Sequence, residues 1–394
     1  MKQNRIMIRS LPEAMAVVKE MNIASSEEWT GDYRGAARDA ISSFLTDRMT
    51  QKLRFHLAER EAGGIPDRRN GHYMRHLLTE LGDVLVSVPR TRTYNPVEVI
   101  RAYARRSQDV DRLILASFLL GLSTRKVGEA LLSILGERVS PATVSRVAKT
   151  LDKAVSAFHR RRLKGTYRAL LFDGVVLTRK TGAGPVKRPV LVALGIRHDG
   201  KKEIIDFRLA RSESADEWES FLTRLTARGL SGRETEVICV DGGPGLISAV
   251  RSVYPLIPLQ RCWAHKMRNI LDKVRKADTE EVKRGLVKIY GAKNLREARS
   301  AAKRWSTAWE DRYPAAVKCL RDDLDDLLTC FGFADKLFRR KIRTTNAIER
   351  VFREVRRRTR PMGVFENRTS MERILYAVFL YENIRYGVHY VFAC

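Results

Sequence analysis

A single carboxylate interrupts the apolar run Leu170–Leu177, and this run constrains the fold more than any other stretch. The run is short, contains valine and phenylalanine, and is bounded by polar residues, which predicts a buried strand. A buried charge needs a partner, and a metal ion would compensate Asp173 best. The run Glu236–Val240 leads in the same way to Asp241. We therefore expect one divalent-metal site built from distant segments; the alternative is that both carboxylates bind backbone amides at turns.

The charge of the chain indicates nucleic acid as a partner. The 394 residues carry a formal net charge of +28, which attracts phosphate backbones. A ribosomal or membrane-surface role would also agree with the charge alone. The sequence shows no apolar run long enough to span a bilayer, no signal peptide, and five cysteines without paired spacing. We therefore expect a protein of the reducing cytoplasm, close to the chromosome.

The first 108 residues predict a helical region that carries a small hairpin. Apolar residues recur at helical spacing between Glu27 and Glu61, and the segment Gly63–Pro66 ends that pattern. The alternation in Val84–Val88 predicts the hairpin, and a helix is expected over Pro96–Arg106.

Residues 109–164 are typical of a helix-turn-helix DNA-binding domain. Ser140-Pro141 gives the last helix an N-cap followed by proline in its first turn. This helix is expected to bury Val144, Val147, Ala148 and Leu151. Its opposite side presents the residues that would lie in the major groove, Thr143, Ser145, Arg146 and Lys149. The alternative is an ordinary helical hairpin in a bundle.

From residue 165 the pattern changes to strands. They are expected over Tyr167–Leu177, Pro189–Ile196, Glu203–Leu209, Glu236–Val240 and Ile257–Arg261. A Gly/Pro turn is expected over Lys180–Lys187, and helices over Ser214–Arg228 and Leu246–Val253. Periodicity alone predicts only a mixed α/β domain, although a ribonuclease-H-like sheet would show the same order.

Asp206, on the third of these strands, serves as a control for the other two aspartates. Apolar residues alternate there with Asp206 and Arg208, which predicts a half-exposed strand. We therefore expect Asp206 to be solvated. Asp173 and Asp241 have apolar neighbours on both sides of the strand and lack that exposure.

The stretch from Cys262 to about Ala334 is helical and polar, which indicates an insertion that interrupts the α/β domain. Its acidic run Arg321–Asp326 is expected to be an exposed helix face. Trp263, at its start, has two interpretations. It could stack on an unpaired DNA base, because an aromatic face binds any base, or it could fill the junction between sheet and insertion.

A basic helix follows over Arg343–Arg360, and an amphipathic helix over Ser370–Tyr390 closes the chain. The apolar stripe of the basic helix comprises Ile348, Val351, Phe352 and Val355. Beside this stripe fall Glu349, Arg353, Arg356 and Arg360. We expect the three arginines to bind phosphates; the alternative is a solvated basic face. The spacing from Asn346 also allows Glu349 to belong to a capping box.

Several short passages, in their order and separations, resemble one family. They are Arg69-Asn-Gly-His72, Val88-Pro-Arg90, Gly121-Leu-Ser-Thr-Arg-Lys-Val127, Val139-Ser-Pro-Ala-Thr-Val-Ser145, Phe172-Asp-Gly174, Val240-Asp-Gly242, Arg261-Cys-Trp-Ala-His265 and Thr344-Thr-Asn-Ala-Ile-Glu349. The chain resembles bacterial insertion-sequence transposases of the Mutator-like superfamily over nearly its whole length. The resemblance implies a ribonuclease-H-like catalytic domain with an Asp-Asp-Glu triad, here Asp173, Asp241 and Glu349. It also implies a Cys-x-x-His signature, matched by Cys262 and His265.

The pattern and the resemblance together predict five parts and place the protein in a bacterial cytoplasm, associated with the nucleoid. The parts are a helical region with a hairpin at 1–108, a helix-turn-helix domain at 109–164, the first part of the catalytic core at 165–262, an all-helical insertion at 263–340 and the C-terminal core helices that carry the glutamate at 341–394. A structural zinc at Cys262 and His265 is not expected, because no second pair has comparable spacing.

The expected chemistry follows from the three carboxylates, which can hold two Mg²⁺ ions about 3.5–4 Å apart, with Mn²⁺ as a substitute. Such a site would hydrolyse phosphodiester bonds at the element ends and join the 3′ ends to other DNA. The expected partners are double-stranded DNA, as terminal inverted repeats and as target, and a further copy of the chain, giving at least a dimer. The alternatives are a ribonuclease-H-like nuclease or resolvase, and a DNA-binding regulator on the same scaffold.

Overall fold

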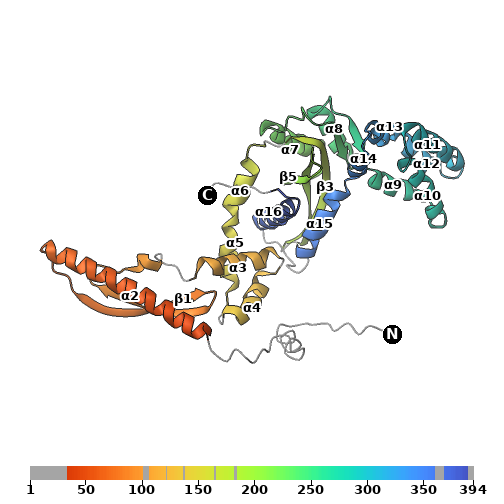
Figure 1. Cartoon of the computed structure of the whole chain (residues 1–394). Helices are drawn as coiled ribbons and strands as arrows, with labels where there is room; N and C mark the ends of the chain where they lie inside the picture. Colours follow the sequence, from red (N-terminus) through yellow and green to blue (C-terminus); the bar gives the residue numbers. More distant parts are fainter. Residues whose placement is uncertain are drawn as a thin grey trace, which may run out of the picture. The chain divides into compact units, whose positions relative to one another are not determined.

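The structure is a computed structural model that describes residues 33–100, 106–120, 122–135, 138–163, 166–181, 184–359 and 368–388 (Figure 1). The chain forms two compact units, which divide after Thr150. This division falls earlier than the boundary expected at residue 164. Helix α6 (Leu151–Arg160) belongs to the second unit, where the ring of Phe158 packs against Phe207 and Tyr376.

The first unit combines a long helix with a two-stranded sheet. Helix α2 (Tyr33–Ala62) packs against strands β1 (Arg69–Thr79) and β2 (Gly82–Thr91), which pair antiparallel. The predicted hairpin is confirmed, with strands longer than expected. The small core of this unit contains Met49, Leu77, Val84, Val86, Val88 and Ile100. Of the helix expected after Pro96, the structure describes a 3-10 turn, η1 (Val97–Ile100); residues 101–105 lie outside the described part, as do residues 27–32.

Three short helices complete the first unit and contact one another. They are α3 (Gln108–Leu119), α4 (Thr124–Leu135) and α5 (Pro141–Lys149). The N-cap predicted at Ser140 is confirmed, because its side chain accepts a hydrogen bond from the Thr143 amide. Val144, Val147 and Ala148 are buried as expected. The helix ends at Lys149, so the predicted fourth residue, Leu151, begins α6 instead.

The second unit is built on a five-stranded mixed sheet, so the predicted mixed α/β core is confirmed. The strands are β3 (Tyr167–Thr181), β4 (Gly184–Arg197), β5 (Lys202–Leu209), β6 (Val237–Val240) and β7 (Leu259–Arg261). Their order is β5-β4-β3-β6-β7. The first three pair antiparallel, and β6 and β7 continue parallel to β3. The turn expected over Lys180–Lys187 is wrong in extent, because β3 and β4 remain paired up to Thr181 and Gly184.

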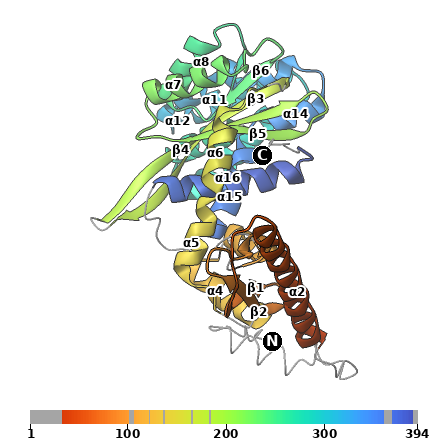
Figure 2. The same cartoon turned by 90° about the vertical axis from the view of Figure 1, so that its left-hand side faces the viewer.

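Helices cover both faces of this sheet (Figure 2). On one face lie α7 (Ala215–Ala227) and α8 (Pro244–Val253). Their apolar side chains form one core with the sheet, which includes Trp218, Phe221, Leu225, Leu246 and Val250 together with Phe172, Leu191 and Ile238. On the other face lie α15 (Asn346–Thr359) and α16 (Arg368–Arg385), with α6 beside α16.

Helix α16 is enclosed rather than amphipathic. Buried residues follow one another without a break from Arg373 to Phe379. Near its end, the Asn383 side chain accepts a hydrogen bond from the Ile204 amide at 2.7 Å and donates one to the Ile204 carbonyl at 3.0 Å. The helix therefore satisfies the backbone of Ile204 on β5, the edge strand, at a position that would otherwise be open to pairing.

The expectation that Asp206 is solvated is wrong. The residue is 2% exposed, and its carboxylate receives hydrogen bonds from His159 on α6 and from Arg228 after α7. The pairing of β4 with β5 shifts register beside Ile205, so a bulge breaks the alternation on which the expectation rested. Both faces of the sheet are also covered, so a polar residue at this position cannot reach water.

An all-helical segment is inserted between β7 and α15 and has its own apolar core. Its helices are α9 (Trp263–Leu271), α10 (Thr279–Tyr290), α11 (Leu295–Trp309), α12 (Pro314–Arg321), α13 (Leu324–Leu328) and α14 (Lys336–Ile342), with 3-10 turns η2 (Lys276–Asp278) and η3 (Thr329–Gly332). Their core includes Val282, Leu286, Ile289, Trp305, Val317 and Leu320. Within the described residues, no helix has the length and apolarity that a bilayer crossing requires.

Candidate active site

Asp173 lies in the middle of β3 and is 2% exposed. Its Oδ2 atom is buried and has no hydrogen-bond partner. Burial raises the pKa of Asp173 to about 7, and the negative charges of Asp241 and Glu349 act in the same direction, whereas His265 and Thr345 oppose them. The fold therefore holds a buried carboxylate with one oxygen that it does not itself satisfy.

Asp241 follows β6 directly and lies beside Asp173. The parallel pairing of β3 with β6 places Phe172 opposite Val240, so the next residue of each strand is an aspartate. One carboxylate oxygen, Oδ1, accepts a hydrogen bond from the Gly243 amide at 2.9 Å. The alternative role of a turn carboxylate thus applies to one oxygen of Asp241 and does not account for Asp173.

Glu349 reaches the same place from the first turn of α15. Its Oε1 atom lies 3.5 Å from His265 Nε2 and 3.7 Å from Arg268 Nη2, both on α9. Helix α15 is anchored by the apolar stripe predicted from the sequence, since Ile348, Val351, Phe352 and Val355 are all buried. The glutamate is therefore held at the edge of the sheet by packing on the far side of its own helix.

Thr345 connects the Cys262–His265 signature to the residues of the site. Its amide lies 3.3 Å from Cys262 Sγ, and its hydroxyl lies 3.5 Å from both Cys262 Sγ and His265 Nδ1. The pKa of His265 is raised to about 9, chiefly by the hydrogen bond between His265 and Cys262. Burial of His265 lowers this pKa, whereas the negative charges of Asp173 and Asp241 raise it further. A protonated His265 would partly offset the carboxylates around it.

A cleft of about 670 Å³ opens in front of these residues. Asp173, His265 and Glu349 line it together with Arg268, Arg350, Arg353 and Arg356. Arg353 and Arg356 were expected near the site, whereas Arg360 lies outside the described residues. Arg350 and Arg268 were missed; Arg350 precedes Arg353 at i,i+3 spacing, which could have indicated it, but only the tertiary fold brings α9 to the cleft.

The site has the ligand types that suit a hard divalent cation. Carboxylate oxygens are the donors that Mg²⁺ prefers, and the unsatisfied Oδ2 atom of Asp173 is an acceptor that a cation would complete. In the described part of the chain, no three His, Cys, Asp or Glu side chains are yet arranged to hold one ion. Burial, followed by repulsion from Asp241 and Glu349, raises the pKa of Asp173, so a bound cation would favour its charged form.

Comparison with known proteins identifies the family of this chain. The model of the family described as "Transposase, Mutator family" matches residues 12–386. The chain belongs to this family. A transposase for IS905 of Lactococcus lactis is 28% identical over 91% of this chain and 90% of its own length. A transposase for IS256 in Tn4001 of Staphylococcus aureus is 31% identical over 79% of this chain and 80% of its own. One for IS1081 of Mycobacterium tuberculosis is 32% identical over 79% and 75%.

One solved structure, a Drosophila P element transposase strand transfer complex, covers 74% of this Mutator-family chain and 83% of its own chain. The sequence identity is 11% and the TM-score is 0.31. A similarity this low does not bear on the site, which is described from the residues of this chain alone.

Trp263 does not lie open to a DNA base in this Mutator-family chain. It is 2% exposed, packs against Tyr290, and donates a hydrogen bond from Nε1 to the Leu327 carbonyl at 2.8 Å. The interpretation that it stacks on an unpaired base is therefore wrong, and Trp263 fills the junction between the sheet and the insertion. The sequence could not distinguish the two interpretations of Trp263, because its burial depends on how the helices of the insertion pack around it.

Asp323 fixes the insertion to the strand end beside Asp241, a role the sequence did not indicate. It pairs with the buried Lys266 and, at 3.1 Å, with Arg261. Arg261 in turn donates a hydrogen bond to the Gly242 carbonyl at 3.3 Å. The expectation that the whole acidic run is an exposed helix face is therefore wrong at Asp323.

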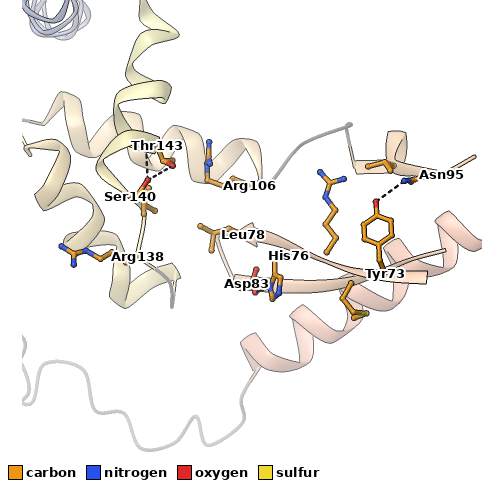
Figure 3. Close-up of a pocket in the computed structure, with 13 residues that line it drawn as sticks. Tyr73, His76, Leu78, Asp83, Asn95, Arg106, Arg138, Ser140 and Thr143 are labelled. Carbon is orange, nitrogen blue, oxygen red and sulfur yellow. Dashed lines mark hydrogen bonds and ion pairs between the residues drawn. The ribbon is translucent and has the colours of Figure 1, made fainter. Parts of the chain in front are cut away.

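The residues expected to read DNA lie on α5 in the first unit. Arg146 and Lys149 are exposed, while Thr143 and Ser145 are half-buried. A cleft of about 970 Å³ separates the start of α5 from the β1–β2 hairpin, as Figure 3 shows. Basic and polar side chains line it, among them Tyr73, Arg75, Arg106, Arg138, Ser140 and Thr143. The hairpin residues were missed, because nothing in the sequence placed the hairpin against α5.

Proposed function

We propose that this chain is the transposase of an insertion sequence. It binds the terminal inverted repeats, hydrolyses phosphodiester bonds at the element ends and joins the 3′ ends to other DNA. Family membership supports the reaction class, since the relatives named above are transposases for insertion sequence elements. The observation that carries the proposal is the unsatisfied, buried oxygen of Asp173, beside Asp241 and Glu349 in a cleft lined by arginines.

Asp173, Asp241 and Glu349 would hold two divalent ions, Mg²⁺ or its substitute Mn²⁺. When bound, these ions would activate the attacking oxygen and stabilise the leaving oxygen of an in-line displacement. Three carboxylates suffice as protein ligands, because Mg²⁺ keeps several waters and takes further oxygens from the phosphate.

The other residues of the cleft bind and orient the DNA. Arg350, Arg353 and Arg356 lie on one helix and face the same cleft as the carboxylates, where they would bind the phosphates on either side of the scissile bond. His265 and Arg268 hold the Glu349 side chain near Asp173. Thr345 and Cys262 position His265 and contribute no reacting atom.

The catalytic core would have a ribonuclease-H-like architecture. Three antiparallel strands followed by two parallel strands, in the order β5-β4-β3-β6-β7, support this assignment. The two aspartates lie side by side on the parallel strands β3 and β6 or directly after them. The glutamate lies on α15, which follows the all-helical insertion in the chain. The parts would accordingly be a core at 165–262 and 341–394 and an insertion at 263–340.

The first unit would recognise the terminal repeats through α3, α4 and α5, the part of the predicted helix-turn-helix at 109–164 that lies before Thr150. Arg146 and Lys149 on α5 would contact phosphates or bases, with Thr143 and Ser145 beside them. The cleft next to α5 supports a wider contact, in which Arg75 and Arg138 neutralise the DNA backbone. Because two element ends must be brought together, the active form would contain at least two copies of the chain.

A strand-transfer assay tests the proposal. It uses the full chain, Mg²⁺, a duplex that ends in the element's inverted repeat and a plasmid target. Repeat ends joined to the plasmid support a transposase, and the Asp173→Asn variant should give none. Cleavage without joining would indicate a nuclease or resolvase, and binding without cleavage a DNA-binding regulator.

A further inference from the structure

The paired ends of β3 and β4 form a two-stranded ribbon that extends beyond the rest of the sheet (Figure 2). The two strands stay paired up to Thr181 and Gly184. On one side, the pairing of β3 with β6 stops at Phe172. On the other side, the pairing of β4 with β5 stops at Val190, and the Pro189 carbonyl accepts one more hydrogen bond from the residue after β5. Among the described strands, none runs alongside β3 and β4 past these points.

The ribbon begins at the cleft that contains the carboxylates. Gly174, Val175 and Val176 follow Asp173 on β3 and line that cleft. At strand geometry the path from Val175 to Thr181 covers roughly 20 Å, about the length of six base pairs of duplex DNA. A duplex with one phosphate in the cleft can therefore run along the ribbon.

The ribbon is basic. Its strands contain the sequences Thr178-Arg-Lys-Thr181 and Val186-Lys-Arg188, and no Asp or Glu occurs between Asp173 and Asp199. Positive charge without acidic neighbours in the sequence attracts the phosphates of nucleic acid. A two-stranded ribbon also has a width that the major groove of duplex DNA admits. Charge and shape together indicate duplex DNA as the partner of the ribbon.

Two of the basic residues have defined positions on β4. Lys187 is exposed and pairs with Thr178, whereas Arg188 is half-buried and pairs with Leu177. Successive strand residues point to opposite faces, so Lys187 and Arg188 lie on opposite faces of the ribbon. Leu177 lies four positions after Asp173 on the same strand, which puts Arg188 on the face that carries the Asp173 side chain. Both faces of the ribbon therefore offer a charge to phosphates.

We propose that the ribbon of Val175–Thr181 and Gly184–Arg188 binds target DNA, the duplex to which the element ends are joined. This inference rests on the proposed function. The DNA that flanks the element is covalently attached to the bound repeat until cleavage, so its effective concentration is high without contacts of its own. Target DNA arrives as a separate molecule and depends on such contacts. The competing role of Lys187 and Arg188 is to keep the open strand edges from pairing with other chains.

Target affinity tests this role without a chemical step. The full chain is saturated with a duplex that ends at the cleaved 3′ end of the repeat, in EDTA. The Kd for a fluorescent duplex of unrelated sequence is then measured by anisotropy. The double variant Lys187→Gln/Arg188→Gln should raise this Kd by about tenfold or more, and the loss of two phosphate contacts should lower the slope of log Kd against log salt by about two units.

Two matched variants separate charge from structure. Lys187→Arg/Arg188→Lys keeps both charges and should retain the wild-type Kd. Arg296→Gln/Lys303→Gln removes two exposed charges from α11 of the insertion and should also leave the Kd unchanged. In Lys187→Gln/Arg188→Gln, cleavage of a repeat end with attached flanking DNA should fall much less than target affinity, because the flank is tethered. A wild-type urea midpoint shows that this variant is folded.

Each outcome decides between the roles. If Lys187→Gln/Arg188→Gln binds target with the wild-type Kd, or only aggregates more readily, the two residues protect strand edges and the inference is overturned. If its affinity for the repeat end falls as much as its affinity for target, the ribbon holds the element's own DNA and the target role is overturned. If the Kd rises as expected but the wild type joins no ends with Mg²⁺, the capture of a second duplex stands and the proposed strand transfer fails.

Discussion

Asp173 and Asp206 are buried to the same extent on strands of one sheet, yet the fold treats them differently. Each is 2% exposed. Asp206 receives hydrogen bonds from His159 at 2.7 Å and from Arg228, and its own strand supplies the Phe207 amide. Asp173 has one oxygen without any partner, and two of its charged neighbours are also negative.

The two environments indicate two uses of a buried charge. A buried carboxylate is costly unless it is paired, and around Asp206 the helices α6 and α7 provide the pairing within the fold. Around Asp173 the compensation is incomplete, and the residue opens onto a cleft lined by arginines. One aspartate therefore belongs to the stability of the sheet, whereas the other is, in the function proposed above, left for a bound cation and its DNA.

The largest expected effect is the loss of cleavage in Asp173→Asn. The amide is isosteric but cannot compensate a cation, so repeat-end cleavage should fall by about 10³-fold or more. The free energy of unfolding should not fall, because a neutral group removes the repulsion from Asp241 and Glu349. Cleavage assays and urea titration check both statements. If Asp173→Asn instead lowers the free energy of unfolding, the Asp173 carboxylate stabilises the fold as Asp206 does, and the difference between the two residues is refuted.

The opposite behaviour is expected of Asp206→Ala. Removing Asp206 takes the carboxylate acceptor from His159 and from one nitrogen of Arg228, which should lower the free energy of unfolding by about 3–5 kcal/mol. Urea titration measures this loss, with Asp311→Ala, an exposed residue after α11, as the matched control. An unchanged urea midpoint for Asp206→Ala would mean that the hydrogen bonds of Asp206 with His159 and Arg228 do not stabilise the fold.

The sequence was informative where the signal is local. Apolar residues around Asp173 and Asp241 predicted buried strands, and the stripe on α15 predicted the buried face of that helix. Asp206 was misjudged because a bulge at Ile205 changes which way the strand residues point, and alternation cannot reveal an extra residue.

The parts of the site that the sequence missed depend on contacts between distant segments. Arg268 lines the cleft from α9, the first helix of the insertion. Trp263 was open to two interpretations until the insertion core was seen to bury it. Glu349 was predicted only through the resemblance of Thr344–Glu349 to the family. The pattern of the helix alone did not single it out, because a glutamate on a basic helix can also cap the helix or pair with an arginine.

A smaller effect should separate the two aspartates without any measurement of catalysis. A ligand that binds only the folded state stabilises it, by about 2.7 kcal/mol at one hundred times its Kd. Mn²⁺ should therefore raise the free energy of unfolding of the wild type and not that of Asp173→Asn. Asp206→Ala should gain the same increment above its own lowered baseline, because its change lies outside the cation site. Equal gains in all three proteins would assign the Mn²⁺ effect to other carboxylates.

The smallest expected effect concerns the arginines around the unsatisfied carboxylate. Arg353 is exposed on α15 and lines the cleft, so it should neutralise one phosphate. Arg353→Gln should lower the salt dependence of DNA binding by about one unit of slope, with little change in sequence preference. Arg296→Gln, which changes an exposed arginine on α11 of the insertion, is the matched control. Equal slopes for both variants would return Arg353 to a solvated basic face and leave Arg350 and Arg356 to bind the DNA.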